Sequence, residues 1–155
     1  MDYAEDITVG ETRRFGKHSV SEAELVDFAR EWDPQSFHID RAAAESGVYG
    51  GLIASGIHTL AIGQRLAVDA VYAQWHVIAG RRLVEVRFLR PVRVGDTLSG
   101  TNTVREVAVD DKGRAQVAND VVLVNQADKP VLSMTVEVLV RARPGADTAR
   151  GPRLS

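Results

Sequence analysis

The sequence predicts a single α+β domain in which one antiparallel β-sheet wraps around one buried helix. Helical periodicity is confined to the first half of the chain, whereas residues after about Val77 alternate between apolar and polar with a period of two. The segment from Ile57 to about Ala73 is apolar on nearly every face. A helix of that composition is usually buried in the middle of a domain, so this segment is expected to be the one that the sheet surrounds.

The first helix is expected to begin at Ser21, because Ser21 and Glu24 have the spacing of a capping box. One apolar helical face follows, formed by Leu25, Phe28, Ala29 and Trp32. Pro34 disfavours helical geometry at the preceding residue, so the helix should end at Asp33. Residues 33–39 are therefore expected to form a loop.

The segments on either side of this helix and loop are expected to contain one short helix and otherwise no regular structure. Residues 1–20 are interpreted as a short lead-in. Asp40 is expected to cap a second short helix over residues 41–46, which Gly47 would close. The flexible pair Gly50-Gly51 then leads to the long apolar helix.

The second half of the chain contains four runs that are typical of β-strands. The first run places Val84, Val86 and Phe88 on one face and Glu85 and Arg87 on the other. Three more runs cover residues 97–104, 117–124 and 132–141. Turn residues separate the runs, which predicts an antiparallel meander. The domain is expected to cover residues 1–143, and residues 144–155 are expected to be a disordered tail because they lack periodicity.

Composition excludes several classes of function. The chain has 155 residues, of which 45% are hydrophobic and 26% charged, and its net charge is -2. That balance gives no electrostatic footprint for nucleic acid or for an anionic membrane. The absence of cysteine excludes thiolate nucleophiles, cysteine zinc sites and iron–sulfur clusters. The acidic first residues do not resemble a signal peptide and no segment approaches about 20 apolar residues, so a cytoplasmic protein is expected.

The first candidate for chemistry is the pair Asp33 and His38, which are five residues apart in a loop that contains proline. A loop can turn both side chains toward one point, where they could hold a water molecule and move its proton near neutral pH. The alternative is structural, with Asp33 capping the turn and His38 packing in the core. None of the four histidines has metal-ligand partners at a recognised spacing, so no metal site is expected.

The second candidate is the start of the long helix, at Ser55 and Gly56. The first turn of a helix has free N–H groups and the positive end of the helix dipole. Because Gly56 lacks a Cβ, a ligand carbonyl could approach its N–H closely and find an oxyanion hole. The alternative is an ordinary helix cap at Ser55 followed by a packing glycine.

Three sequence blocks resemble the MaoC-like dehydratases, which are also called (R)-specific enoyl-CoA hydratases. The blocks are Trp32–Asp40, Gly51–Thr59 and Arg87–Leu98, and they occur in the order and spacing of that family. The resemblance implies the hotdog fold, a curved antiparallel sheet around a long central helix. It also implies that Asp33 and His38 are the catalytic pair and that Gly56 provides the oxyanion hole.

The sequence departs from the family pattern inside two of these blocks. Gln35 stands where many members have asparagine, Ser36 where they have proline and Ser55 where they have histidine. The catalytic residue types and their spacing are retained, so the departures bear on the substrate more than on the reaction class. We expect Ser55, Gln35 and Phe37 to contact the substrate.

The resemblance therefore implies an enoyl-CoA hydratase, acting in reverse as a 3-hydroxyacyl-thioester dehydratase, that needs no metal or redox cofactor. The acyl thioester of coenzyme A or of an acyl carrier protein would be the substrate, and a homodimer or a dimer of dimers the assembly. No nucleic acid or membrane partner is expected. Two alternatives remain open: a hotdog acyl-CoA thioesterase, in which water attacks the carbonyl carbon, and a subunit that binds acyl thioesters without catalysis.

Overall fold

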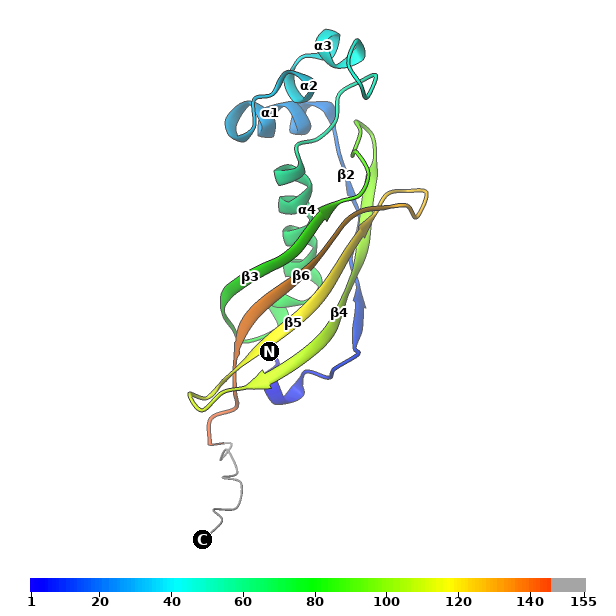
Figure 1. Cartoon of the computed structure of the whole chain (residues 1–155). Helices are drawn as coiled ribbons and strands as arrows, with labels where there is room; N and C mark the ends of the chain where they lie inside the picture. Colours follow the sequence, from blue (N-terminus) through cyan, green and yellow to red (C-terminus); the bar gives the residue numbers. More distant parts are fainter. Residues whose placement is uncertain (146–155) are drawn as a thin grey trace.

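The computed structural model describes residues 1–145, so all but the first two residues of the expected 144–155 tail lie outside it. A curved sheet packs along one side of helix α4 (Gly56–Ala70), and three short helices lie together beyond the amino end of α4 (Figure 1). These are α1 (Glu22–Trp32), α2 (Ser36–Ile39) and α3 (Arg41–Glu45). The α+β architecture predicted from the sequence is confirmed.

The sheet has six strands and is antiparallel throughout, with the order β1-β4-β5-β6-β3, while β2 pairs separately with β4. Four of the strands are long: β3 (Val77–Phe88), β4 (Thr97–Val109), β5 (Arg114–Val124) and β6 (Pro130–Arg141). Each includes or overlaps one of the four runs identified by period-two alternation. The meander expected from the sequence is therefore present from β4 to β6, whereas β3 lies at the far edge of the sheet beside β6.

The expectation that residues 1–20 form only a lead-in is wrong. They contain a 3₁₀ helix at Ala4–Asp6 and two short strands, β1 (Thr12–Arg14) and β2 (His18–Ser19), both paired with β4. Strands of two or three residues are too short to show alternation, so their partner on β4 defines them and their own sequence does not.

The three helices beyond the end of α4 largely follow their sequence signals. The Ser21 hydroxyl accepts the Glu24 N–H at the start of α1, and the Asp40 carboxylate accepts the Ala43 N–H at the start of α3. The interpretation of residues 33–39 as a loop is wrong in its second half, because Ser36–Ile39 forms a single helical turn, α2. Pro34 ends α1 as expected, but the chain re-enters helix two residues later.

Helix α4 is the central helix, although only one side of it is covered in the single chain. Its inner side buries Ile62, Gly63, Leu66 and Ala67 against the sheet, and it exposes Ala61, Gln64 and Arg65 on the other side. A Cβ at Gly63 would lie 3.1 Å from a Leu123 methyl carbon, so glycine lets the helix approach β5 closely. Burial on every side, which the apolar composition predicts, is thus not reached within one chain. Among residues 1–145, no helix is both long and apolar enough to cross a membrane.

The regular alternation expected along residues 84–88 is interrupted by a β-bulge. Val84 lies opposite Thr135, but Phe88 lies opposite Leu132, so β3 contains one residue more than β6 over this stretch. Glu85, inside the bulge, has φ of 49°, in the left-handed region that non-glycine residues rarely adopt. Val84 and Phe88 therefore face opposite sides of the sheet, and the prediction that they share one face is wrong.

Candidate active site

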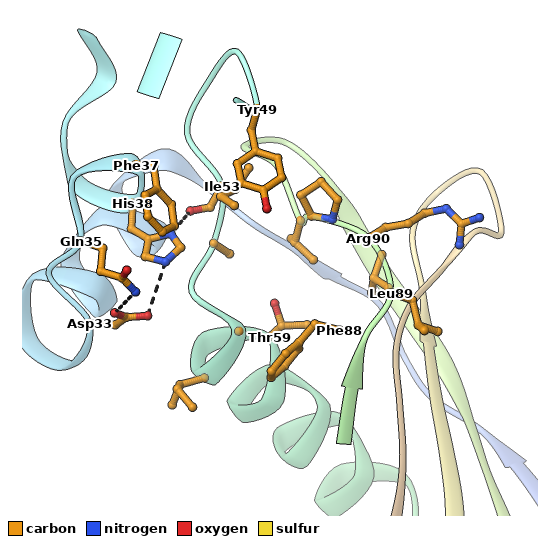
Figure 2. A pocket seen from close by; sticks show the side chains of 16 residues that line it. Asp33, Gln35, Phe37, His38, Tyr49, Ile53, Thr59, Phe88, Leu89 and Arg90 are labelled. Carbon is orange, nitrogen blue, oxygen red and sulfur yellow. Dashed lines mark hydrogen bonds and ion pairs between the residues drawn. The ribbon is translucent and has the colours of Figure 1, made fainter. Parts of the chain in front are cut away.

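A cavity of about 500 Å³ lies where the amino end of α4 meets the end of α1, helix α2 and the end of β3 (Figure 2). Asp33 and His38 line one side of it, and Phe88 and Leu89 line the opposite side. Gly56, at the first turn of α4, lines the cavity between them. Its volume is in the range of small-molecule binding sites, and the structure brings three sequence-distant segments together around it.

Asp33 is held in place by two hydrogen-bond donors. It caps the carboxyl end of α1, where Pro34 stops the helix. The Ser55 hydroxyl donates to its Oδ2 at 2.7 Å, and the Gln35 side-chain amide donates to its Oδ1 at 2.7 Å. These two hydrogen bonds, the Ser55 bond first, keep the pKa of Asp33 below the ordinary value of a carboxyl group. Asp33 is therefore an ionised hydrogen-bond acceptor at neutral pH.

His38 is 4% exposed and is fixed by a backbone carbonyl. Its Nδ1 lies 2.6 Å from the Ile53 carbonyl oxygen, and its Nε2 lies 3.4 Å from Oδ2 of Asp33. Because a carbonyl oxygen only accepts hydrogen bonds, Nδ1 must carry the proton of this contact. In the neutral ring Nε2 then has a free lone pair, and it points toward the Asp33 carboxylate (Figure 2).

The amino end of α4 supplies the third part of the site. The Ser55 hydroxyl accepts the Ile57 N–H at 3.2 Å and so caps the helix, in addition to its bond to Asp33. The Ala54 N–H donates a hydrogen bond to the Val92 carbonyl at 2.8 Å, which links the residues before the helix to the segment after β3. The first N–H groups of α4 have no acceptor within the helix, and the dipole end of α4 favours negative charge at Gly56.

The structure places five of the six residues proposed from the sequence on the cavity, and one behind it. Asp33, His38, Gly56, Gln35 and Phe37 line the cavity. Ser55 is fully buried, and its hydroxyl is directed at Asp33 and the α4 backbone. Gln35 likewise uses its amide to hold Asp33.

Three features of the site were not identified from the sequence. The Ile53 carbonyl that orients His38 carries no side-chain signal. Tyr49 and Thr59 line the cavity but belong to segments interpreted only as a joint and a helix. Phe88 was assigned to a strand face, and only the bulge in β3 turns it toward the cavity. Among residues 1–145, no cluster of three histidine, aspartate or glutamate side chains has an arrangement that could hold a metal ion.

Comparison with protein families and with individual proteins gives matches that cover most of the chain. The family model described as a MaoC like domain matches residues 5–126. The uncharacterized protein YdeM of Bacillus subtilis is 31% identical over 140 residues, a match that covers 88% of this chain and 97% of that protein. The 3-hydroxyacyl-thioester dehydratase Z of Mycobacterium tuberculosis is 32% identical over 118 residues, covering 72% of this chain and 66% of that protein.

Comparison with solved structures confirms the hotdog fold expected from the sequence blocks. The crystal structure of a MaoC-like dehydratase from Rhodospirillum rubrum matches with a TM-score of 0.86 and 36% sequence identity. The match covers 93% of this chain and 99% of that one.

Proposed function

The chain belongs to the MaoC-like dehydratase family, and from this premise we propose that it adds water reversibly across the double bond of trans-2-enoyl thioesters. The product would be the corresponding 3-hydroxyacyl thioester. The observation that carries the proposal is the meeting of an ionised Asp33 and an oriented His38, 3.4 Å apart, on a cavity beside the amino end of α4. The Mycobacterium tuberculosis relative is named a 3-hydroxyacyl-thioester dehydratase, which supports this reaction.

The pair is suited to hold and activate a water molecule. With the His38 ring neutral, Oδ2 of Asp33 and Nε2 of His38 are both acceptors, so one water that contacts both atoms donates one hydrogen to each. As the water oxygen forms a bond to C3 of the substrate, the pair takes one proton from it. The electrons of the double bond move toward the thioester carbonyl, and the pair delivers one proton to C2. Atoms and charge balance, and the pair returns to its starting state.

The amino end of α4 would stabilise the charge that develops during this step. As water adds to C3, negative charge accumulates on the thioester oxygen as an enolate. Gly56 lines the cavity at the first turn of α4, so its N–H and the helix dipole would be in place before the reaction begins and little reorganisation would be needed. Removing one donor of this kind typically costs about 10²–10³ in rate.

The test is hydration of crotonyl-CoA and longer enoyl-CoA esters, followed by the loss of enoyl-thioester absorbance. We expect Asp33→Asn and His38→Gln each to lower turnover by about 10²–10⁴, which is the usual contribution of general acid–base groups. Asp27→Asn, on the exposed side of α1, and His76→Gln, beyond the far end of α4, are matched controls that should keep activity. Circular dichroism of every variant confirms that the fold is retained.

Three outcomes would contradict the proposal. Retained activity in both Asp33→Asn and His38→Gln would remove the pair from the mechanism. Release of free thiol from acyl-CoA without hydration would identify a thioesterase. Acyl-CoA binding in a calorimeter with no turnover at any chain length would identify a binding subunit.

We propose further that the working form is a homodimer joined along β3. Within residues 1–145, β3 pairs only with β6, so its other edge presents free backbone groups over twelve residues. Val77, Ile78 and Leu83 are exposed along this strand, with Leu83 48% exposed although it lies opposite the buried Val136. A partner strand would cover them. Light scattering should give twice the chain mass, and Leu83→Arg should shift the protein toward the monomer; a monomeric wild-type chain would contradict this.

A further inference from the structure

The ring of Phe88 lies directly against the amino end of α4. A Cβ built on Gly56 would lie 2.8–3.0 Å from three atoms of that ring, which is closer than real Cβ contacts. Position 56 must therefore be glycine for as long as the ring occupies this place. Phe88 and Gly56 line the same cavity, and the ring lies across from Asp33 and His38 (Figure 2).

The bulge in β3 is what aims Phe88 at this position. Leu132, the partner of Phe88 on β6, packs inward, with a side-chain carbon 3.5 Å from the Cβ position of Gly63 on α4. Opposite residues of an antiparallel pair share a face, so Phe88 also faces α4. Without the extra residue near Glu85, Phe88 would share a face of the sheet with Val84. That is the outer face, on which Thr135, the partner of Val84, also lies.

The unusual backbone at Glu85 supports a functional reading of the bulge. A non-glycine residue in the left-handed region is disfavoured, typically by about 1–3 kcal/mol, and such positions persist where the surrounding structure holds them. Bulges beside active sites commonly redirect one side chain. Here the redirected side chain is an aromatic ring that is 53% exposed, so the ring contributes less to the core than to the wall of the cavity.

We propose that Phe88 is a specificity-determining residue that restricts the site to acyl groups without a substituent at C2. The proposal rests on the hydratase function above. In that reaction the thioester oxygen lies at the Gly56 N–H and C3 lies at the Asp33–His38 pair, so C2 lies between them. Of the three atoms nearest to a Cβ position at Gly56, all belong to the Phe88 ring, so this ring is the wall beside C1 and C2.

The test compares crotonyl-CoA with its C2-methyl analogue, 2-methylcrotonyl-CoA, as substrates of the wild type and of Phe88→Ala. One methyl group in a tight apolar site is worth about 10–200-fold in kcat/KM. We expect the wild type to prefer crotonyl-CoA strongly, and Phe88→Ala to reduce that preference by about tenfold or more. Phe88→Leu, which keeps an apolar side chain of intermediate size, should give an intermediate ratio and serves if the alanine variant does not fold.

Leu89→Ala is the matched control, because Leu89 is the next residue, is half exposed and lines the same cavity without being among the atoms nearest to Gly56. In this variant, the ratio of kcat/KM for crotonyl-CoA to kcat/KM for 2-methylcrotonyl-CoA should stay close to that of the wild type. An unchanged ratio in Phe88→Ala and Phe88→Leu would overturn the proposal. An equal change in Leu89→Ala would also overturn it, because the effect would then be a general widening of the cavity.

A binding experiment separates failure of this proposal from failure of the hydratase function. Butyryl-CoA and 2-methylbutyryl-CoA are saturated and cannot be hydrated, so calorimetry measures the fit of the acyl group without turnover. We expect the wild type to bind the unbranched ester at least tenfold more tightly, and Phe88→Ala to bind the two about equally. Equal binding by the wild type would overturn the role of Phe88 even if crotonyl-CoA is hydrated, whereas absent hydration with discriminating binding would contradict only the hydratase function.

Discussion

Replacing Ser55 with alanine tests whether the cap of α4 also holds Asp33, the proposed catalytic carboxylate. The Ser55 hydroxyl donates to the ionised Asp33 at 2.7 Å and accepts the Ile57 N–H at 3.2 Å, in a fully buried position. A hydrogen bond to a charged group is worth about 1.5–3 kcal/mol. The same bond is present in the resting enzyme, so only the part of it that positions Asp33 for the reaction affects the rate. We expect kcat/KM to fall about tenfold, which corresponds to about 1.4 kcal/mol. Stability should also fall by more than about 1 kcal/mol, because the helix loses its cap and Asp33 loses a donor.

The control for Ser55→Ala is Ser21→Ala, which removes the equivalent cap from α1. The Ser21 hydroxyl accepts the Glu24 N–H at 3.2 Å and, within residues 1–145, makes no hydrogen bond to Asp33. Both variants should lose stability in urea denaturation, Ser55→Ala more because it also loses the bond to Asp33, but only Ser55→Ala should lose activity on crotonyl-CoA. If the two variants keep activity equally, within about twofold of wild type, Ser55 acts only as a helix cap and the reasoning is refuted.

The same variant has a pH signature, and two further substitutions test neighbouring contacts. Because the Ser55 bond is the main cause of the low pKa of Asp33, the acid limb of the kcat/KM profile should move to higher pH in Ser55→Ala; an unmoved limb contradicts the assignment. Gly56→Ala would place a Cβ 2.8–3.0 Å from the tip of the Phe88 ring, so the two positions should be coupled. A double-mutant cycle of Gly56→Ala and Phe88→Ala in urea should give an interaction energy of about 0.5–3 kcal/mol, and additive effects would contradict the contact. Burial lowers the pKa of His58 from 6.5, although its hydrogen bond to Glu24 opposes this shift. The unfolded chain therefore binds a proton more readily, and stability falls as pH drops below about 6.5. His58→Gln should reduce this fall between about pH 7 and about pH 5, and equal slopes in denaturation would count against it.

Local sequence signals identified the parts of the fold that depend on neighbouring residues. The caps at Ser21 and Asp40 and the apolar composition of α4 are properties of contiguous segments, and the structure confirms the helices that they predict. The short strands β1 and β2 and the bulge at Glu85 could not be predicted in this way. Each exists only because of pairing with a strand far along the chain, and no residue pattern within these segments encodes the partner's register.

The candidate site shows the same division between local and distant information. The five-residue spacing of Asp33 and His38 is local, and it correctly suggested that the two side chains meet. Two of the groups that orient them are distant: Ser55, one of the two donors to Asp33, is 22 residues away, and the acceptor for His38 is 15 residues away. Ser55 was therefore interpreted as a substrate contact, although the structure directs its hydroxyl at Asp33.

The segment from Ile53 to Gly56 contacts both members of the proposed catalytic pair. Its first carbonyl fixes the ring of His38, its serine holds Asp33, and its glycine lines the cavity in which we propose that the thioester binds. Gly56 begins α4, Ser55 caps it, and Ile53 lies before the cap in a bridge with Arg93. Because Asp33 and His38 are both hydrogen-bonded to this segment, their distance from Gly56 depends on where the segment lies. A displacement of this segment would disturb every part of the site together, so substitutions within it should act as a unit and not as independent contributions.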